Sequence, residues 1–148
     1  EYIATQLSER GSPSPSPFPF SELKALDVGC GGGLLSESLS RLGASVTAID
    51  PSKELVEQAR RHSQLDPRTR SIDYRGGWTV EKLVAQECDT KFDVICLLEV
   101  IEHVTDVDSI LSSIRSLLKP DGKLFLSTLN RTAKSKIVAI VGAEYVMR

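Results

Sequence analysis

The sequence is short of cysteine, of long apolar runs and of surplus charge, and each shortage excludes a class of protein. Three cysteines at positions 30, 88 and 96 make an odd number without paired spacing, so neither a disulfide framework nor a zinc knuckle is expected. The longest apolar run, residues 137–141, is far below the roughly 20 residues of a membrane-spanning helix. Lys and Arg (18) nearly balance Asp and Glu (20), which argues against a nucleic-acid partner.

The length of 148 residues and a hydrophobic content of 41% predict one domain with a real core. Residues 1–10 are compatible with a helix. Prolines alternate with other residues over 12–19, which predicts a surface loop or linker, because proline fits neither a helix interior nor a central strand. A proline-motif ligand is less favoured, since no basic residues flank this stretch. We therefore divide the chain into an N-terminal helix and loop (1–22) and a main domain (23–148).

Short apolar runs alternate with helical periods from residue 23 onward. Strands are expected at 25–28, 45–49, 71–74, 92–98 and 123–129, and helices at 34–42, 54–64, 107–118 and 133–147. This alternation is typical of an α/β fold with a doubly wound, mostly parallel sheet covered on both faces. Ligands of such sheets bind beyond the carboxyl ends of the strands.

A glycine-rich loop follows the first expected strand and reads Asp-Val-Gly-Cys-Gly-Gly-Gly (27–33). Glycines between a strand and a helix let the backbone approach a ligand closely, and the helix start offers free N–H groups. The third glycine of a dinucleotide fingerprint would fall on Leu34, which disfavours a nicotinamide oxidoreductase. Asp27, inside the strand, suits a cationic ligand group. A tight turn without a ligand is the alternative.

Asp50 ends the second expected strand, 21 residues after Gly29. A carboxylate at this place can accept hydrogen bonds from both hydroxyls of a ribose. It can also act as a helix N-cap before Pro51, and the two roles are compatible.

The stretches Leu-Asp-Val-Gly-Cys-Gly-Gly-Gly (26–33) and Ala-Ile-Asp (48–50) resemble class I S-adenosylmethionine-dependent methyltransferases, which have a Rossmann-like fold. The resemblance implies S-adenosylmethionine as methyl donor. Its ammonium and sulfonium fit an aspartate beside a helix N-terminus. The implied cofactor-binding residues are Asp27, Gly29, Gly31, Asp50 and Leu98.

Three further stretches narrow the resemblance: Cys-Leu-Leu-Glu-Val-Ile-Glu-His-Val (96–104), Phe-Leu-Ser-Thr-Leu-Asn-Arg-Thr-Ala-Lys-Ser (125–135) and Val-Gly-Ala-Glu-Tyr-Val-Met-Arg (141–148). Together they resemble the ubiquinone-biosynthesis O-methyltransferases. That family implies methylation of a catechol hydroxyl on a polyprenylated ring and contact with other ubiquinone-biosynthesis proteins. It also implies further strands after Arg148. The implied location is the matrix side of the mitochondrial inner membrane, or the cytoplasmic face of a bacterial membrane.

Glu99, Glu102 and His103 are spaced i, i+3 and i+4, so one helical turn would bring their side chains together. Such a set could hold a divalent metal, and the family resemblance implies one here. The oxygen ligands favour Mg²⁺, while the imidazole would also suit Zn²⁺, Mn²⁺ or Fe²⁺. The alternative is that these side chains cap the following helix. With or without metal, Glu102 and His103 are the expected catalytic residues, and His103 is the candidate general base.

Residues 134–148 combine an apolar surface with basic residues, and six basic but two acidic residues lie between 119 and 148. A basic, apolar helix here predicts peripheral contact with an anionic membrane. A helix packed on the sheet is the alternative. For the whole protein, rival functions are methylation of another small phenol and a non-catalytic scaffold in a biosynthetic assembly.

Overall fold

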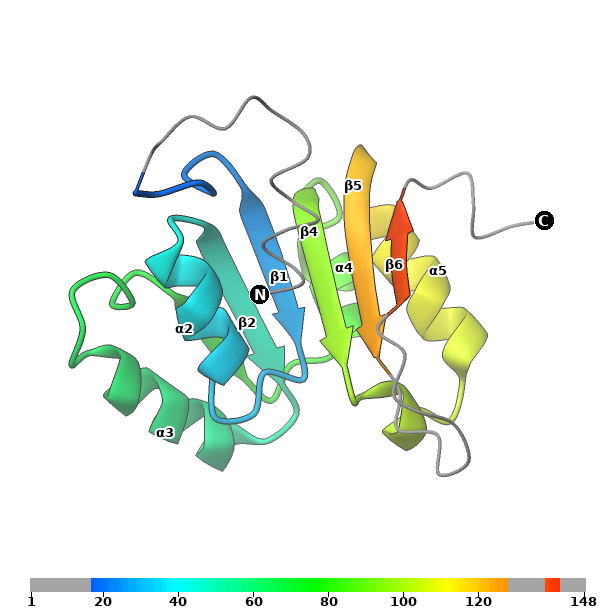
Figure 1. Cartoon of the computed structure of the whole chain (residues 1–148). Helices are drawn as coiled ribbons and strands as arrows, with labels where there is room; N and C mark the ends of the chain where they lie inside the picture. Colours follow the sequence, from blue (N-terminus) through cyan, green and yellow to red (C-terminus); the bar gives the residue numbers. More distant parts are fainter. Residues whose placement is uncertain (1–16, 128–137, 142–148) are drawn as a thin grey trace.

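The computed structural model describes residues 17–127 and 138–141 of the chain (Figure 1). The described elements, in chain order, are β1 (Lys24–Val28), α2 (Leu34–Arg41), β2 (Ser45–Asp50), α3 (Lys53–Ser63), β3 (Asp73–Gly76), α4 (Val80–Gln86), β4 (Phe92–Leu98), a 3-10 turn (Ile101–His103), α5 (Val107–Leu117), β5 (Leu118–Ser127) and β6 (Val138–Val141).

The strands form one sheet in the order β3-β2-β1-β4-β5-β6, in which β1 to β5 are parallel and β6 is antiparallel to β5. In the register, Val28 at the end of β1 lies beside Ile49 of β2 and Leu97 of β4. The carboxyl ends of β1, β2 and β4 therefore meet at one edge of the sheet. This confirms the predicted α/β fold with a doubly wound, mostly parallel sheet.

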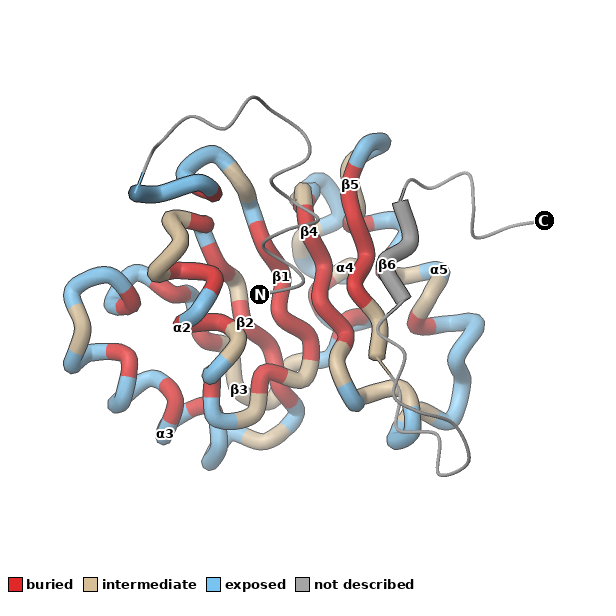
Figure 2. Tube along the Cα trace, in the orientation of Figure 1, coloured by how far each residue is buried: buried red, intermediate tan, exposed pale blue. Residues whose placement is uncertain are grey.

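Helices cover both faces of the sheet (Figure 1), and an apolar layer lies beneath them on each face. Residues of α2 and α3 pack with Ala25 of β1 on one face, and residues of α4 and α5 pack with Leu26 on the other. Because side chains alternate along a strand, Asp27 points to the same face as Ala25, beneath the start of α2. The central strands β1, β2 and β4 are mostly buried, whereas the outer sides of the helices are exposed (Figure 2).

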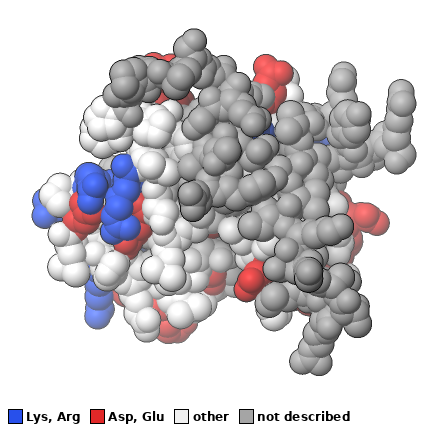
Figure 3. Space-filling view, in the orientation of Figure 1, with Lys and Arg blue, Asp and Glu red and all other residues white. Residues whose placement is uncertain are grey.

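The helices that cover the sheet expose charges of both signs. Over α3, basic and acidic side chains lie intermixed (Figure 3). Several of them are paired, such as Arg61 with Glu57 at 3.1 Å and Arg41 with Asp66 at 2.9 Å. Exposed pairs of this kind add little to stability, so the fold rests mainly on the two apolar layers.

Most expected elements are found close to their predicted bounds, but β3 and β5 differ. A turn in which the Ile72 N–H donates to the Thr69 carbonyl delays β3 to residue 73. β5 begins at Leu118, which pairs with Phe92, and its register shifts before Val94. The shift contains Pro120, which has no N–H to donate to the ladder, so residues 119–122 form an irregularity inside the strand.

Helix α4 was not predicted. Its sequence signal is short: Thr79 accepts a hydrogen bond from the Lys82 N–H as N-cap, and Val80 and Leu83 are buried three residues apart. Two apolar residues at that spacing are too few to distinguish a helix from a loop, so a seven-residue helix leaves little periodic signal in the sequence.

The helix predicted over residues 133–147 is wrong at 138–141, which form strand β6. The segment reads Val-Ala-Ile-Val, and β-branched residues favour strands. Antiparallel pairing with β5 from Val138 to Val141 also occupies the edge that β5 would otherwise expose. The membrane-binding helix expected over 134–148 is therefore not a helix at 138–141, and its other residues lie outside the described residues. The helix expected at 1–10 also lies outside them.

None of the described helices is long and apolar enough to cross a membrane.

Candidate functional site

The glycine loop after β1 is fastened to β2 by its backbone. The N–H groups of Gly29 and Cys30 both donate to the Ile49 carbonyl, at 2.9 and 3.1 Å. Gly29 has φ of 71°, and a Cβ atom there would lie 2.3 Å from Cγ2 of Val100. Only glycine therefore lets this loop pass so close to the segment that follows β4.

Asp50 connects the ends of three strands. Its carboxylate accepts the Gly31 N–H at 3.0 Å and the Ser52 N–H at 2.7 Å, while its carbonyl accepts the N–H groups of Gly77 and Trp78. The N-cap of α3 is Ser52, whose hydroxyl accepts the Leu55 N–H, so the alternative role of Asp50 as helix cap is wrong. A carboxylate offers about four acceptor positions, which leaves two for the hydroxyls of a ribose.

Asp27 is a buried carboxylate, 3% exposed, at the foot of α2. The hydroxyl of Ser36 donates to its Oδ2 at 2.6 Å. Burial raises the pKa of Asp27 to about 6, which the hydrogen bond from Ser36 opposes and the nearby charge of Asp50 reinforces. A cation bound beside it would be attracted by the ionised form and would lower this pKa.

A cavity of about 540 Å³ opens at the carboxyl edge of the sheet. It is lined by Asp27, Gly29, Cys30, Gly32, Leu34, Leu35, Leu98, Glu99 and Ser127. Of the predicted cofactor residues, Asp27, Gly29 and Leu98 line it directly, and Gly31 and Asp50 are joined beside it by their hydrogen bond. Among the described residues, the lining contains the acids Asp27 and Glu99 but neither Lys nor Arg, which favours a cationic ligand.

Sequence reasoning missed three residues of the lining, which are Leu34, Leu35 and Ser127. Leu34 is 79% exposed at the rim of the cavity. The available signal was its place directly after the glycine loop, at the start of α2. Ser127 ends β5, beside Leu98 of β4 in the register, and its carbonyl accepts the Glu99 N–H at 3.2 Å.

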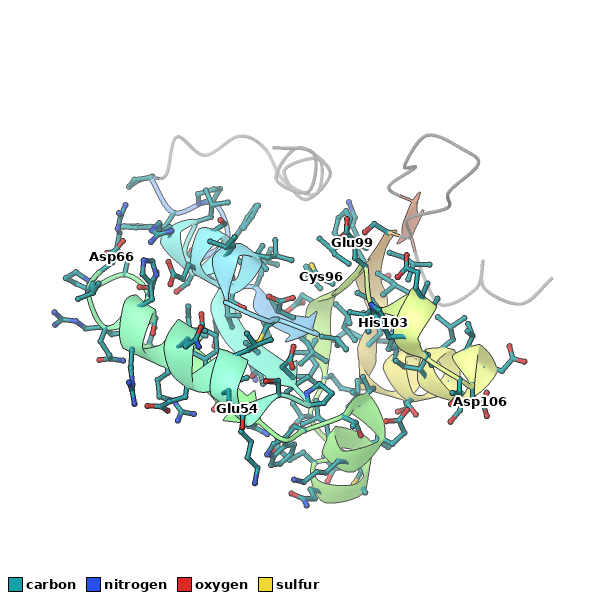
Figure 4. All side chains as sticks on the ribbon, turned by 90° about the horizontal axis from the view of Figure 1, so that it is seen from below. Glu54, Asp66, Cys96, Glu99, His103 and Asp106 are labelled. Atoms are coloured by element: carbon teal, nitrogen blue, oxygen red, sulfur yellow. The ribbon has the colours of Figure 1, made fainter. Side chains whose placement is uncertain are left out.

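The predicted convergence of Glu99, Glu102 and His103 is not found. Glu99 has φ of 58°, in the left-handed region, and the 3-10 turn begins only at Ile101, so no continuous helical turn contains all three (Figure 4). Within residues 17–127 and 138–141, no group of three or more His, Cys, Asp and Glu side chains lies close enough to hold a metal ion. The magnesium site expected from the resemblance does not fit this arrangement.

The contact between Gly29 and Val100 can be tested with neighbouring glycines. We expect Gly29→Ala to lower the melting temperature strongly, because it combines positive-φ strain of about 1–2 kcal/mol with a steric overlap. Gly32→Ala is the control, since its Cβ would meet nothing within 4 Å. Thermal unfolding followed by circular dichroism measures both, and equal melting temperatures would contradict the close approach.

The pKa of Asp27 predicts how cofactor affinity depends on pH. Below pH 6 Asp27 takes up a proton, so the affinity for S-adenosylhomocysteine, which carries an ammonium, should fall about tenfold per pH unit. Titration calorimetry from pH 5 to 8 measures this. Asp27→Asn should bind weakly at every pH, and methylthioadenosine, which lacks the ammonium, should show no such dependence. The same dependence for both ligands would refute the pairing.

Comparison with known proteins agrees with this geometry. The family model described as "Methyltransferase domain" matches residues 3–140. A protein named ubiquinone biosynthesis O-methyltransferase from Xanthomonas euvesicatoria is 49% identical over all 148 residues, which cover 56% of its length. Its namesake from Actinobacillus pleuropneumoniae is 52% identical over 128 residues, or 84% of this chain and 53% of its own length.

The chain thus spans about half the length of these curated relatives. Among solved structures, a protein titled as a putative sarcosine dimethylglycine methyltransferase from Galdieria sulphuraria is similar, with a TM-score of 0.71 and 19% identity over 86% of this chain and 45% of that one. This likeness shows the fold alone. Since the family model covers nearly the whole chain, from the segment before the sheet to β6, the protein belongs to the methyltransferase-domain family.

Proposed function

We propose that the protein transfers a methyl group from S-adenosylmethionine to a catechol hydroxyl of a polyprenylated aromatic ring in ubiquinone biosynthesis. The observation that carries this proposal is the identity of about half of all residues with relatives named ubiquinone biosynthesis O-methyltransferase. This identity extends over the whole chain, including the stretches at 96–104, 125–135 and 141–148 that carried the resemblance.

The site supports the cofactor in its charge and its shape. Asp27 suits the ammonium of the methionine moiety, and Asp50 has acceptor positions left for the ribose hydroxyls. Gly29 and Gly31, held by Ile49 and Asp50, let the backbone approach the ligand between these two carboxylates. The apolar side chain of Leu98 lines the cavity at the end of β4 and suits the adenine ring or the aromatic ring of the acceptor.

The acceptor must lose a proton during the reaction. A phenol has an unperturbed pKa near 10, as in tyrosine, and its neutral form is a poor nucleophile. Because Glu99, Glu102 and His103 do not converge on one point, we derive no step through a magnesium ion. We assign proton removal to His103, which is exposed on the turn after β4 (Figure 4), with Glu102 beside it in the sequence. In-line placement of sulfur, methyl carbon and oxygen supplies much of the remaining rate.

The polyprenyl tail of the proposed acceptor also indicates where in the cell the protein acts. A polyprenyl tail resides in a membrane, so the protein must meet its substrate at a membrane surface. We propose the matrix side of the mitochondrial inner membrane, or the cytoplasmic face of the membrane in a bacterium, together with other proteins of ubiquinone biosynthesis as partners. The relatives named above are bacterial.

The proposed reaction predicts a specific product. Purified protein incubated with S-adenosylmethionine and a prenylated catechol should yield the monomethyl ether and S-adenosylhomocysteine in equal amounts, measured by mass spectrometry. A short-chain prenylated catechol should react faster at limiting concentration than unsubstituted catechol. Equal rates with both would favour the alternative of a general small-phenol methyltransferase, and no product with any catechol would overturn the proposal.

The general-base assignment predicts an unequal effect of the two histidines in this chain. His103→Ala should lower kcat about 10²–10⁴-fold with cofactor affinity nearly unchanged. His62→Ala is the control, because His62 lies on α3, where it pairs with the buried Glu37 at 2.6 Å, and not on the turn after β4. If chelation abolished activity and Mg²⁺ restored it, or if both variants lost equal activity, the assignment to His103 would be wrong.

A further inference from the structure

Ser36 is fully buried in the first turn of α2, and its hydroxyl forms a hydrogen bond with a residue that lines the cavity. Its Oγ donates to Oδ2 of Asp27 at 2.6 Å, and its peptide N–H also faces that carboxylate. The N-cap of α2 is Gly33, which contributes no side-chain hydrogen bond. Asp27 thus takes the place of a side-chain cap, because it accepts hydrogen bonds from Ser36 in the first turn of the helix.

Other neighbours oppose the charge on Asp27. Burial disfavours it, and the carboxylate of Asp50 adds repulsion. The nearby thiols and phenol stay neutral at physiological pH, because burial raises the pKa of Cys30 to about 12 and also raises those of Cys96 and Tyr74. Among these neighbours, the donor that favours the ionised form of Asp27 is therefore Ser36.

We propose that Ser36 is a positioning residue for the amino-acid end of the cofactor: its hydroxyl holds the Asp27 carboxylate ionised and turned toward the cavity, where it receives the ligand's ammonium. The inference rests on the proposed function, which supplies a ligand with an ammonium group. The hydroxyl and the peptide N–H of Ser36 together leave the carboxylate with acceptor capacity for that ligand. Ser36 does not itself line the cavity, so it acts through Asp27.

The test compares two buried serines of the same helix. Ser36→Ala removes the donor to Asp27. Ser40→Ala is the matched control, because Ser40 is also buried and its hydroxyl donates at 2.7 Å, but to the Arg68 carbonyl and away from the cavity. Ser36→Thr keeps a hydroxyl at the same position. Titration calorimetry with S-adenosylhomocysteine between pH 5 and 8 gives the affinity of each variant and the midpoint of its pH dependence.

We expect Ser36→Ala to move this midpoint upward by about one pH unit, which through protonation of Asp27 weakens binding about twofold at pH 7 and close to tenfold below pH 6. Ser40→Ala should keep the wild-type midpoint, and Ser36→Thr should restore most of it. An unchanged midpoint in Ser36→Ala, whether or not affinity falls by a constant factor, would overturn the proposal, because a merely structural serine would behave in this way.

A second measurement separates this inference from the proposed function. The Asp27 carboxyl can be titrated directly by carbon-13 NMR in the ligand-free protein, where Ser36→Ala should raise its pKa and Ser40→Ala should not. If wild-type protein bound no S-adenosylhomocysteine, the cofactor assignment and the positioning role would both fail, whatever the NMR titration gave. Binding together with an unchanged Asp27 pKa in Ser36→Ala would overturn the positioning role alone.

Discussion

The site depends on one buried carboxylate at the foot of a helix. Asp27 lies inside the central strand β1, on the face that α2 covers, and it is almost inaccessible to solvent. Such a group is costly to keep charged unless donors compensate it. Here the compensation comes from Ser36 in the first turn of α2. Because Ser36 must lie over Asp27, the start of α2 is fixed relative to β1. The glycine loop that connects this strand and this helix is constrained in the same way.

The loop leaves little freedom for its neighbours. Gly29 approaches Val100 so closely that the loops after β1 and β4 cannot be altered independently. Asp50 joins the same loop to the beginning of α3 and, through its carbonyl, to the segment after β3. Four strand ends are thereby set relative to one another before any ligand arrives. A binding site built in this way loses little conformational entropy on binding, which is the general advantage of preorganisation.

Much of this could be predicted from the sequence, because the features involved are local. Strand runs such as Phe92–Leu98 and the pair of Asp27 and Asp50 at strand ends follow from patterns within a few residues. The failures have a different origin. The turn after Glu99 depends on a left-handed backbone that spacing does not reveal, and β6 depends on an open edge of β5. Both are decided by tertiary contacts, which override helical periodicity.

The charge of the cavity also bears on the direction of the proposed reaction. Asp27 and Glu99 line it and Asp50 adjoins it, whereas no Lys or Arg lines it within the part of the chain that the structure describes. S-adenosylmethionine carries a sulfonium in addition to its ammonium, and the sulfur becomes neutral once the methyl group has left. A carboxylate about 5 Å from the sulfonium at an effective dielectric constant near 20 interacts with it by roughly 3 kcal/mol. Under the proposed function, the acidic lining favours the methyl donor over the spent cofactor, and the loss of the sulfonium charge promotes release of S-adenosylhomocysteine.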